Sequence, residues 1–155
     1  LVVRAFNALG IPLKIFGEGP EETHLKALAK PHITFLGKIS DAERAGLYRN
    51  AQAFIHPQVE DFGITPVESM ASGRPVIAYG KGGILETVVP GVTGVFFEEQ
   101  TWECLADTVI RFPEHQWDSL RIRAHAMQFS KERFMKEMKQ YVEERWNEFS
   151  QKLKS

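Results

Sequence analysis

Residues 53–78 predict a strand, a loop, a short helix and a second strand in close succession. The apolar run Ala53–Ile55 is typical of a buried strand, and a helical run, Val67–Ala71, follows after the loop. Gly73 is suited to end that helix, and Pro75–Ala78 has the composition of the next buried strand. Strands that alternate with helices at such short spacing favour a parallel sheet, so an α/β fold is expected.

The start of this helix carries a local signal. Pro66 suits the first helical position, Thr65 is the expected cap, and Glu68 stands three residues after that cap. The backbone N–H groups of Gly63 and Ile64 would then lack partners, and the helix dipole adds partial positive charge beside them. These features predict an anion site, with phosphate as its natural occupant.

Two carboxylates belong to the same stretch. Glu60 lies in the loop and Glu68 in the first turn of the predicted helix. Acceptors beside an anion site suit a ligand with both phosphates and hydroxyls, which favours a nucleotide sugar over a plain nucleotide. We interpret Asp61 as a loop or cap group, and His56, which precedes a proline, as structural.

Further glycine turns follow other predicted strands. Residues 12–16 and 33–37 predict strands before the central unit, and residues 95–97 predict one after it. The turn at 17–19 is either a tight connection or a close approach to a phosphate or base. The loop at 80–83 is either a flexible connection or a second anion site with Lys81 as counter-charge. In a doubly wound parallel sheet, such loops meet at the carboxyl ends of the strands.

The last third of the sequence predicts helices. Thr101 is expected to cap a helix that runs to Phe112, residues 116–127 predict a second helix, and Ser130 begins a long amphipathic one over 130–153. Its apolar side chains recur at spacings of three and four: Phe134, Met138, Tyr141, Val142, Trp146, Phe149 and Leu153. A stripe of this kind is typical of core or domain packing.

The composition argues against several classes of protein. The chain has 155 residues, 43% of them hydrophobic and 25% charged, which is enough for one domain with a core. A formal net charge of −1 gives no basic field for nucleic acid. The single Cys104 excludes an internal disulfide, and no run approaches the roughly 20 apolar residues of a membrane helix. We therefore expect a soluble, cytoplasmic protein; peripheral membrane association and oligomeric state stay open.

The stretch from Glu60 to Ala78, EDFGITPVESMASGRPVIA, resembles the signature of retaining GT-B glycosyltransferases of the "glycosyltransferase group 1" family. The resemblance covers essentially the whole chain. It implies that residues 1–155 form the C-terminal, nucleotide-sugar-binding domain, a Rossmann-like doubly wound α/β fold with extra C-terminal helices. The first strand of that domain, and a loop with a basic pair for the diphosphate, would precede Leu1. The helix over 130–153 would pack back across the cleft toward the other domain.

The resemblance also implies residue roles. Glu60 would contact the transferred sugar and stabilise charge at the anomeric carbon, and Glu68 would accept hydrogen bonds from the ribose hydroxyls. The donor sugar and phosphates would be held by Phe62, Gly63, Ile64, Thr65, Gly82 and Gly83. The rest of the nucleotide would lie against Gly17, Glu18, Gly19, Lys38 and Ile39.

The implied reaction moves a hexose from a nucleoside diphosphate sugar to a hydroxyl with retention, without a metal ion or other cofactor. The motif looks most like that of mannosyltransferases of polysaccharide biosynthesis, so GDP-mannose is the expected donor, with a UDP-sugar as the other possibility. A glycan or lipid-linked acceptor would bind the N-terminal domain, and this chain alone would bind donor weakly and transfer nothing. Two alternatives are a GT-B-like nucleotide-sugar epimerase and a non-catalytic doubly wound module.

Overall fold

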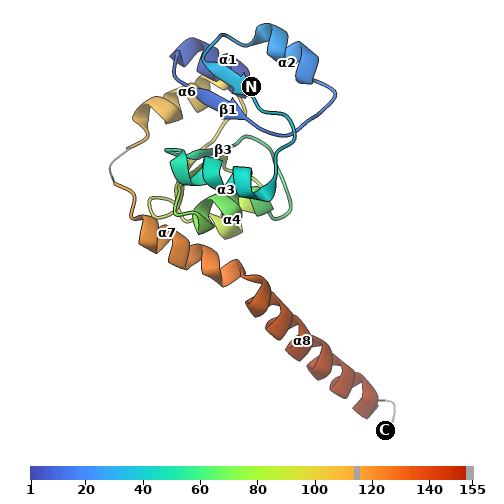
Figure 1. Cartoon of the computed structure of the whole chain (residues 1–155). Coiled ribbons are helices and arrows are strands. Elements are labelled where there is room, and N and C mark those ends of the chain that lie inside the picture. Colours follow the sequence, from blue (N-terminus) through green and yellow to red (C-terminus); the bar gives the residue numbers. More distant parts are fainter. Residues whose placement is uncertain (114–115, 153–155) are drawn as a thin grey trace.

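A computed structural model describes residues 1–113 and 116–152 and shows an α/β body from which one long helix projects (Figure 1). The body begins with α1 (Val2–Leu9), β1 (Leu13–Ile15), α2 (Glu22–Leu28), β2 (Ile33–Phe35), α3 (Asp41–Asn50) and β3 (Phe54–His56). It continues with α4 (Ile64–Ala71), β4 (Val76–Tyr79), α5 (Ile84–Thr87), β5 (Gly94–Phe97) and α6 (Trp102–Arg111). The chain ends with α7 (Ser119–Ala126), the 3₁₀ helix η1 (Met127–Phe129) and α8 (Lys131–Lys152).

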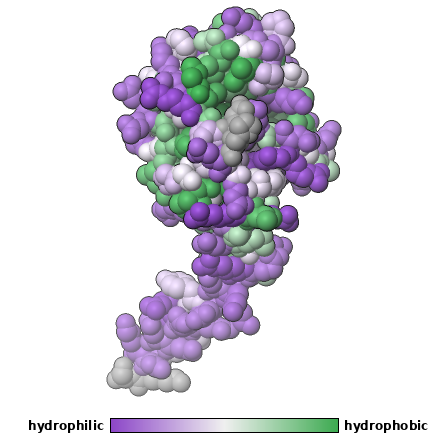
Figure 2. Space-filling model, turned by 90° about the vertical axis from the view of Figure 1, so that its left-hand side faces the viewer, coloured by the Kyte–Doolittle hydropathy of each residue, from purple (hydrophilic) through white to green (hydrophobic). Residues whose placement is uncertain are grey.

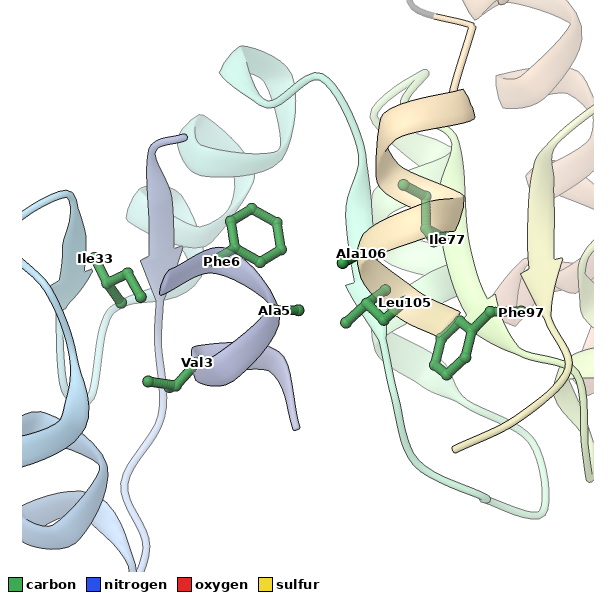
Figure 3. Close-up of a cluster of buried hydrophobic side chains, with 8 residues drawn as sticks. All are labelled: Val3, Ala5, Phe6, Ile33, Ile77, Phe97, Leu105 and Ala106. Atoms are coloured by element: carbon green, nitrogen blue, oxygen red, sulfur yellow. The ribbon is translucent and has the colours of Figure 1, made fainter. Parts of the chain in front are cut away.

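All strand pairs are parallel, as predicted, but they form two sheets. β1 pairs with β2, Leu13 opposite Ile33, and β4 lies between β3 and β5, with Ile77 opposite Ile55 and Val95. No pairing between β1 and β3 occurs in the described part of the chain. Figure 3 shows α1 in the space between the two sheets.

Two hydrophobic clusters form the core. The first joins both sheets through α1 and α6, because Phe6 and Ala5 of α1 face Leu105 and Ala106 of α6 (Figure 3). Its other buried members are Val3, Ile33, Ile77 and Phe97. The second cluster covers the opposite face of the larger sheet and contains Met70 of α4 and Ile122 of α7. Helices therefore lie on both faces of the β3–β4–β5 sheet, as a doubly wound fold requires.

Side-chain caps and a glycine define several helix ends. The side chain of Ser40 accepts a hydrogen bond from the Glu43 N–H, and the Glu43 carboxylate accepts one from the Ser40 N–H, which completes the capping box of α3. The side chain of Thr101 caps α6, as predicted. Gly73 follows α4 with a φ of 77°. The predicted helix over 116–127 is shorter, because Asp118 caps it and α7 gives way to η1 after Ala126.

The terminal helix is long and amphipathic as predicted, but none of its described side chains is buried. It leaves the body beyond η1 and extends away from it, and its side visible in Figure 2 is largely hydrophilic. The apolar residues Phe134, Met135, Met138, Tyr141, Val142, Trp146 and Phe149 are all exposed. Leu153 lies outside the described residues. Among those that are described, no helix is long and apolar enough to cross a membrane.

Candidate functional site

The loops that follow the strands meet in pairs. The N–H of Gly17, after β1, donates to the carbonyl of Gly37, after β2, over 2.8 Å. The N–H of Gly83, after β4, donates to the carbonyl of Glu60, after β3, also over 2.8 Å. The structure therefore brings the turn at 17–19 next to Gly37, which directly precedes Lys38 and Ile39. It also brings the loop of Glu60 next to the 80–83 loop.

Gly82 and Gly83 allow the second of these contacts. A Cβ on Gly82 would lie 2.7 Å from the Glu60 carbonyl oxygen, and a Cβ on Gly83 would clash with the Asp61 carbonyl. Gly82 also has a φ of 83°, which favours glycine. The two glycines thus serve the close packing of two loops, and the Gly83 amide is engaged within the protein.

The helix start predicted at Thr65 and Pro66 is wrong. α4 begins at Ile64, and its N-cap is Gly63, whose φ of 82° turns the backbone into the helix two residues early. Pro66 is therefore the third helical residue, where a missing N–H costs nothing because the first-turn amides have no intrahelical partner. Thr65 is a helical residue and no cap.

The N-terminus of α4 is open to a ligand. No side chain of the described residues caps it, so the amides of Ile64 and Thr65 have no such partner. Ile64 and Phe62 are exposed, and Gly63 between them is buried. Phe62 packs its ring edge-on against Phe129 of η1, 5.7 Å away between centroids. An exposed helix start with free amides can hold a phosphate.

Glu68 lies on α4 and turns toward α3. Its Oε2 accepts from Arg44 Nε at 3.1 Å, and its Oε1 accepts from Arg44 Nη2 at 3.1 Å. The hydroxyl of Tyr48 donates to Oε2 at 3.2 Å. The predicted capping role of Glu68 is therefore wrong, because its carboxylate faces a neighbouring helix and not its own first turn.

Tyr48 links Glu68 to β1 and β3. Its ring is buried and meets Phe16, directly after β1, and Phe54 of β3 edge-on, at centroid distances of 6.0 and 5.5 Å. Burial raises the pKa of the Tyr48 phenol, and the nearby Glu68 charge raises it further. Tyr48 is consequently a hydrogen-bond donor to Glu68 at any physiological pH.

His56 is the last residue of β3, and Glu60 lies in the loop that follows it. The Glu60 side chain is partly buried and accepts a hydrogen bond from the Gln58 amide. His56 is only 1% exposed, and its Nε2 has no hydrogen-bond partner among the described residues. Burial lowers the pKa of His56, opposed by the charge of Glu60, so the imidazole is neutral at pH 7.

Sequence reasoning missed Arg44 and Tyr48. Their spacing of four residues on a helix was the available signal, because it places two long polar-tipped side chains on one face. Of the predicted residues, Lys38 follows Gly37 directly and is exposed, and Ile39 is partly exposed. Glu18 also approaches this turn, since a Cβ on Gly37 would lie 3.9 Å from Glu18 Oε1.

The sequence matches a known protein family over most of its length. The chain belongs to the family of group 1 glycosyl transferases, whose sequence profile matches residues 1–132.

The chain is also similar to named mannosyltransferases. The chain is 48% identical over 63 residues to an alpha-1,3/1,6-mannosyltransferase of Dictyostelium discoideum, a match that covers 40% of this chain and 15% of that protein. It is 36% identical over 95 residues to a GDP-mannose-dependent alpha-mannosyltransferase of Mycolicibacterium smegmatis, covering 61% of this chain and 25% of that protein.

Solved structures share the fold. A sucrose-phosphate synthase from Thermosynechococcus elongatus superposes with a TM-score of 0.79 at 25% identity, over 94% of this chain and 42% of that one. An Anabaena protein crystallised with UDP-glucose superposes with a TM-score of 0.69 at 22% identity, over 82% of this chain and 39% of that one. The chain thus spans less than half the length of each of these proteins.

Proposed function

We propose that this chain is the nucleotide-sugar-binding part of a retaining glycosyltransferase that moves a hexose from a nucleoside diphosphate donor to a hydroxyl acceptor. The observation that carries the proposal is the uncapped N-terminus of α4, whose free amides lie in one short segment with Glu60, in the loop before the helix, and Glu68, on the helix itself. The amides suit a diphosphate, and the carboxylates suit the hydroxyls of ribose and sugar.

In this proposal each element has one task. The amides of Ile64 and Thr65 bind the β-phosphate and stabilise the charge that develops on the leaving diphosphate. Glu68 accepts hydrogen bonds from the ribose, and Glu60 faces the sugar, where its negative charge stabilises the positive charge at the anomeric carbon. The turn at Gly17–Gly19 and the neighbouring Lys38 and Ile39 line the nucleotide.

The proposed sugar is mannose and the proposed donor GDP-mannose, supported by the mannosyltransferase names of the relatives described above. A UDP-sugar is the competing donor. The acceptor, a glycan or lipid-linked hydroxyl, would bind a domain beyond these residues, and transfer would take place in the cytoplasm.

Calorimetric titration of the chain with GDP, UDP and ADP, followed by GDP-mannose, tests the proposal. Selective saturation by GDP supports the GDP-mannose donor, and tighter binding of UDP overturns that part. Glu68→Gln, which removes the charge and keeps the shape, is expected to weaken the selected nucleotide about tenfold or more. If wild type binds none of these ligands, the donor-binding function is refuted. Equal binding by wild type and Glu68→Gln would refute the proposed role of Glu68.

A further inference from the structure

Arg44 makes a forked contact with Glu68 across two helices. α3 and α4 lie side by side (Figure 1), and two different nitrogens of one guanidinium reach the two oxygens of one carboxylate, each at 3.1 Å. A fork of this kind fixes the plane of the carboxylate as well as its position.

A purely structural tie between α3 and α4 explains this contact poorly. The side chains of Arg44 and Glu68 are 28% and 33% exposed, and ion pairs that water reaches contribute little to stability. The same exposure leaves the Glu68 carboxylate within reach of a ligand.

The charged side chains around Glu68 do not cancel its negative charge. Arg44 Nη2 also contacts Asp41 Oδ1 at 3.0 Å, so one guanidinium is shared by two carboxylates. The group of Asp41, Arg44 and Glu68 therefore carries a net charge of −1, which favours hydroxyl donors over a further anion at this point.

The hydrogen bonds to Glu68 also determine which of its two oxygens can accept a further hydrogen bond. A carboxylate offers about four acceptor positions. Arg44 Nε and the Tyr48 hydroxyl occupy two on Oε2, and Arg44 Nη2 occupies one on Oε1. Among the described residues, then, the remaining position is on Oε1.

We propose that Arg44 is a positioning residue for nucleotide binding: its guanidinium holds the Glu68 carboxylate oriented so that Oε1 accepts a hydrogen bond from a ribose hydroxyl. This inference rests on the donor-binding function proposed above. Arg44 itself makes no contact with the phosphates.

The test compares three ligands: GDP, 2′,3′-dideoxy-GDP and inorganic pyrophosphate, with the uridine series in place of the guanosine series if the titrations select UDP. Arg44→Gln is expected to weaken GDP about tenfold and to leave dideoxy-GDP and pyrophosphate unchanged. Arg44→Lys keeps the charge but loses the fork, so it is expected to recover only part of the loss. In a Glu68→Gln background, Arg44→Gln is expected to have no further effect.

Arg111→Gln is the matched control. Arg111 pairs with Asp107 at 3.0 Å on α6, in an exposed ion pair remote from Glu68 in the fold, and its loss is expected to leave all three affinities unchanged. Thermal unfolding of each variant checks that the fold is intact.

Three outcomes overturn the inference. Equal losses for GDP and pyrophosphate in Arg44→Gln would mean that Arg44 binds phosphate directly. Unchanged GDP binding in Arg44→Gln, with a loss in Glu68→Gln, would refute only the positioning role and leave the proposed function standing. Failure of wild type to bind any of the ligands would refute both.

Discussion

The backbone N–H of Gly83 donates to the carbonyl of Glu60 across 2.8 Å and so joins the loop after β4 to the acidic loop after β3. A parallel bridge between Glu60 and Gly82 extends this contact. The position of Glu60, and with it the approach to the start of α4, therefore depends on two glycines that are 22 and 23 residues further along the chain.

Replacement of Gly83 by alanine tests this dependence. The new Cβ would clash with the Asp61 carbonyl, so the two loops must separate. We expect Gly83→Ala to lower the free energy of unfolding by about 1–3 kcal/mol, as overpacking typically does, and to weaken GDP binding. Urea unfolding and calorimetry measure the two effects.

Gly46→Ala is its control. Gly46 lies within α3, and a Cβ there meets no atom within 4 Å. We expect this change to raise stability by up to about 1 kcal/mol through helix propensity, with GDP affinity unchanged. Wild-type affinity in Gly83→Ala would show that the loop contact does not organise the site.

His56 should make stability depend on pH. Burial holds its pKa in the folded chain below the value of about 6.5 expected when unfolded. Its contribution is therefore fully present above pH 6.5. As the pH falls below that value, the unfolded chain binds a proton that the folded chain does not, and stability decreases by up to about 1.4 kcal/mol per pH unit.

Urea unfolding at pH 7.5 and at pH 5.5 measures this loss (both about one unit from the unfolded pKa). His56→Gln has no titrating group at this position and should show a smaller loss between the two pH values. His24→Gln, on the exposed surface of α2, is the control and should behave as wild type. The same loss in His56→Gln as in wild type would contradict the assignment.

The sequence predicted the strands well but did not predict the contacts between helices. Apolar runs predicted the five strands of the described residues, although β1, β3 and β4 each begin one residue later than expected, because strand ends carry no sharp local signal. The Thr65–Pro66 pair predicted the wrong helix start, since the left-handed backbone at Gly63 acts earlier. The Arg44–Glu68 contact joins residues 24 positions apart, and only the packing of α3 on α4 creates it.

Nucleotide binding should not require a divalent cation. The start of α4 offers backbone amides to the diphosphate, and these would take the place of a metal ion. We expect the same GDP affinity in EDTA as in excess magnesium chloride. A clear loss in EDTA would mean that the diphosphate binds as its magnesium complex.

The terminal helix should contribute little to the stability of the body. No described side chain of α8 is buried, and the residues from Lys131 onward lie beyond the ring contact of Phe62 with Phe129, which a chain ending at Ser130 retains. Because stability follows buried apolar area, removal of residues 131–155 should change the melting temperature by less than about 2 °C.

Removal of residues 131–155 should also reduce binding of a hydrophobic dye, since the exposed apolar side chains from Phe134 to Phe149 are lost. As a control, Ile122→Ala truncates a fully buried side chain of α7 and should lower the melting temperature by several degrees. A comparable drop in the shortened chain would show that α8 packs on the body in solution.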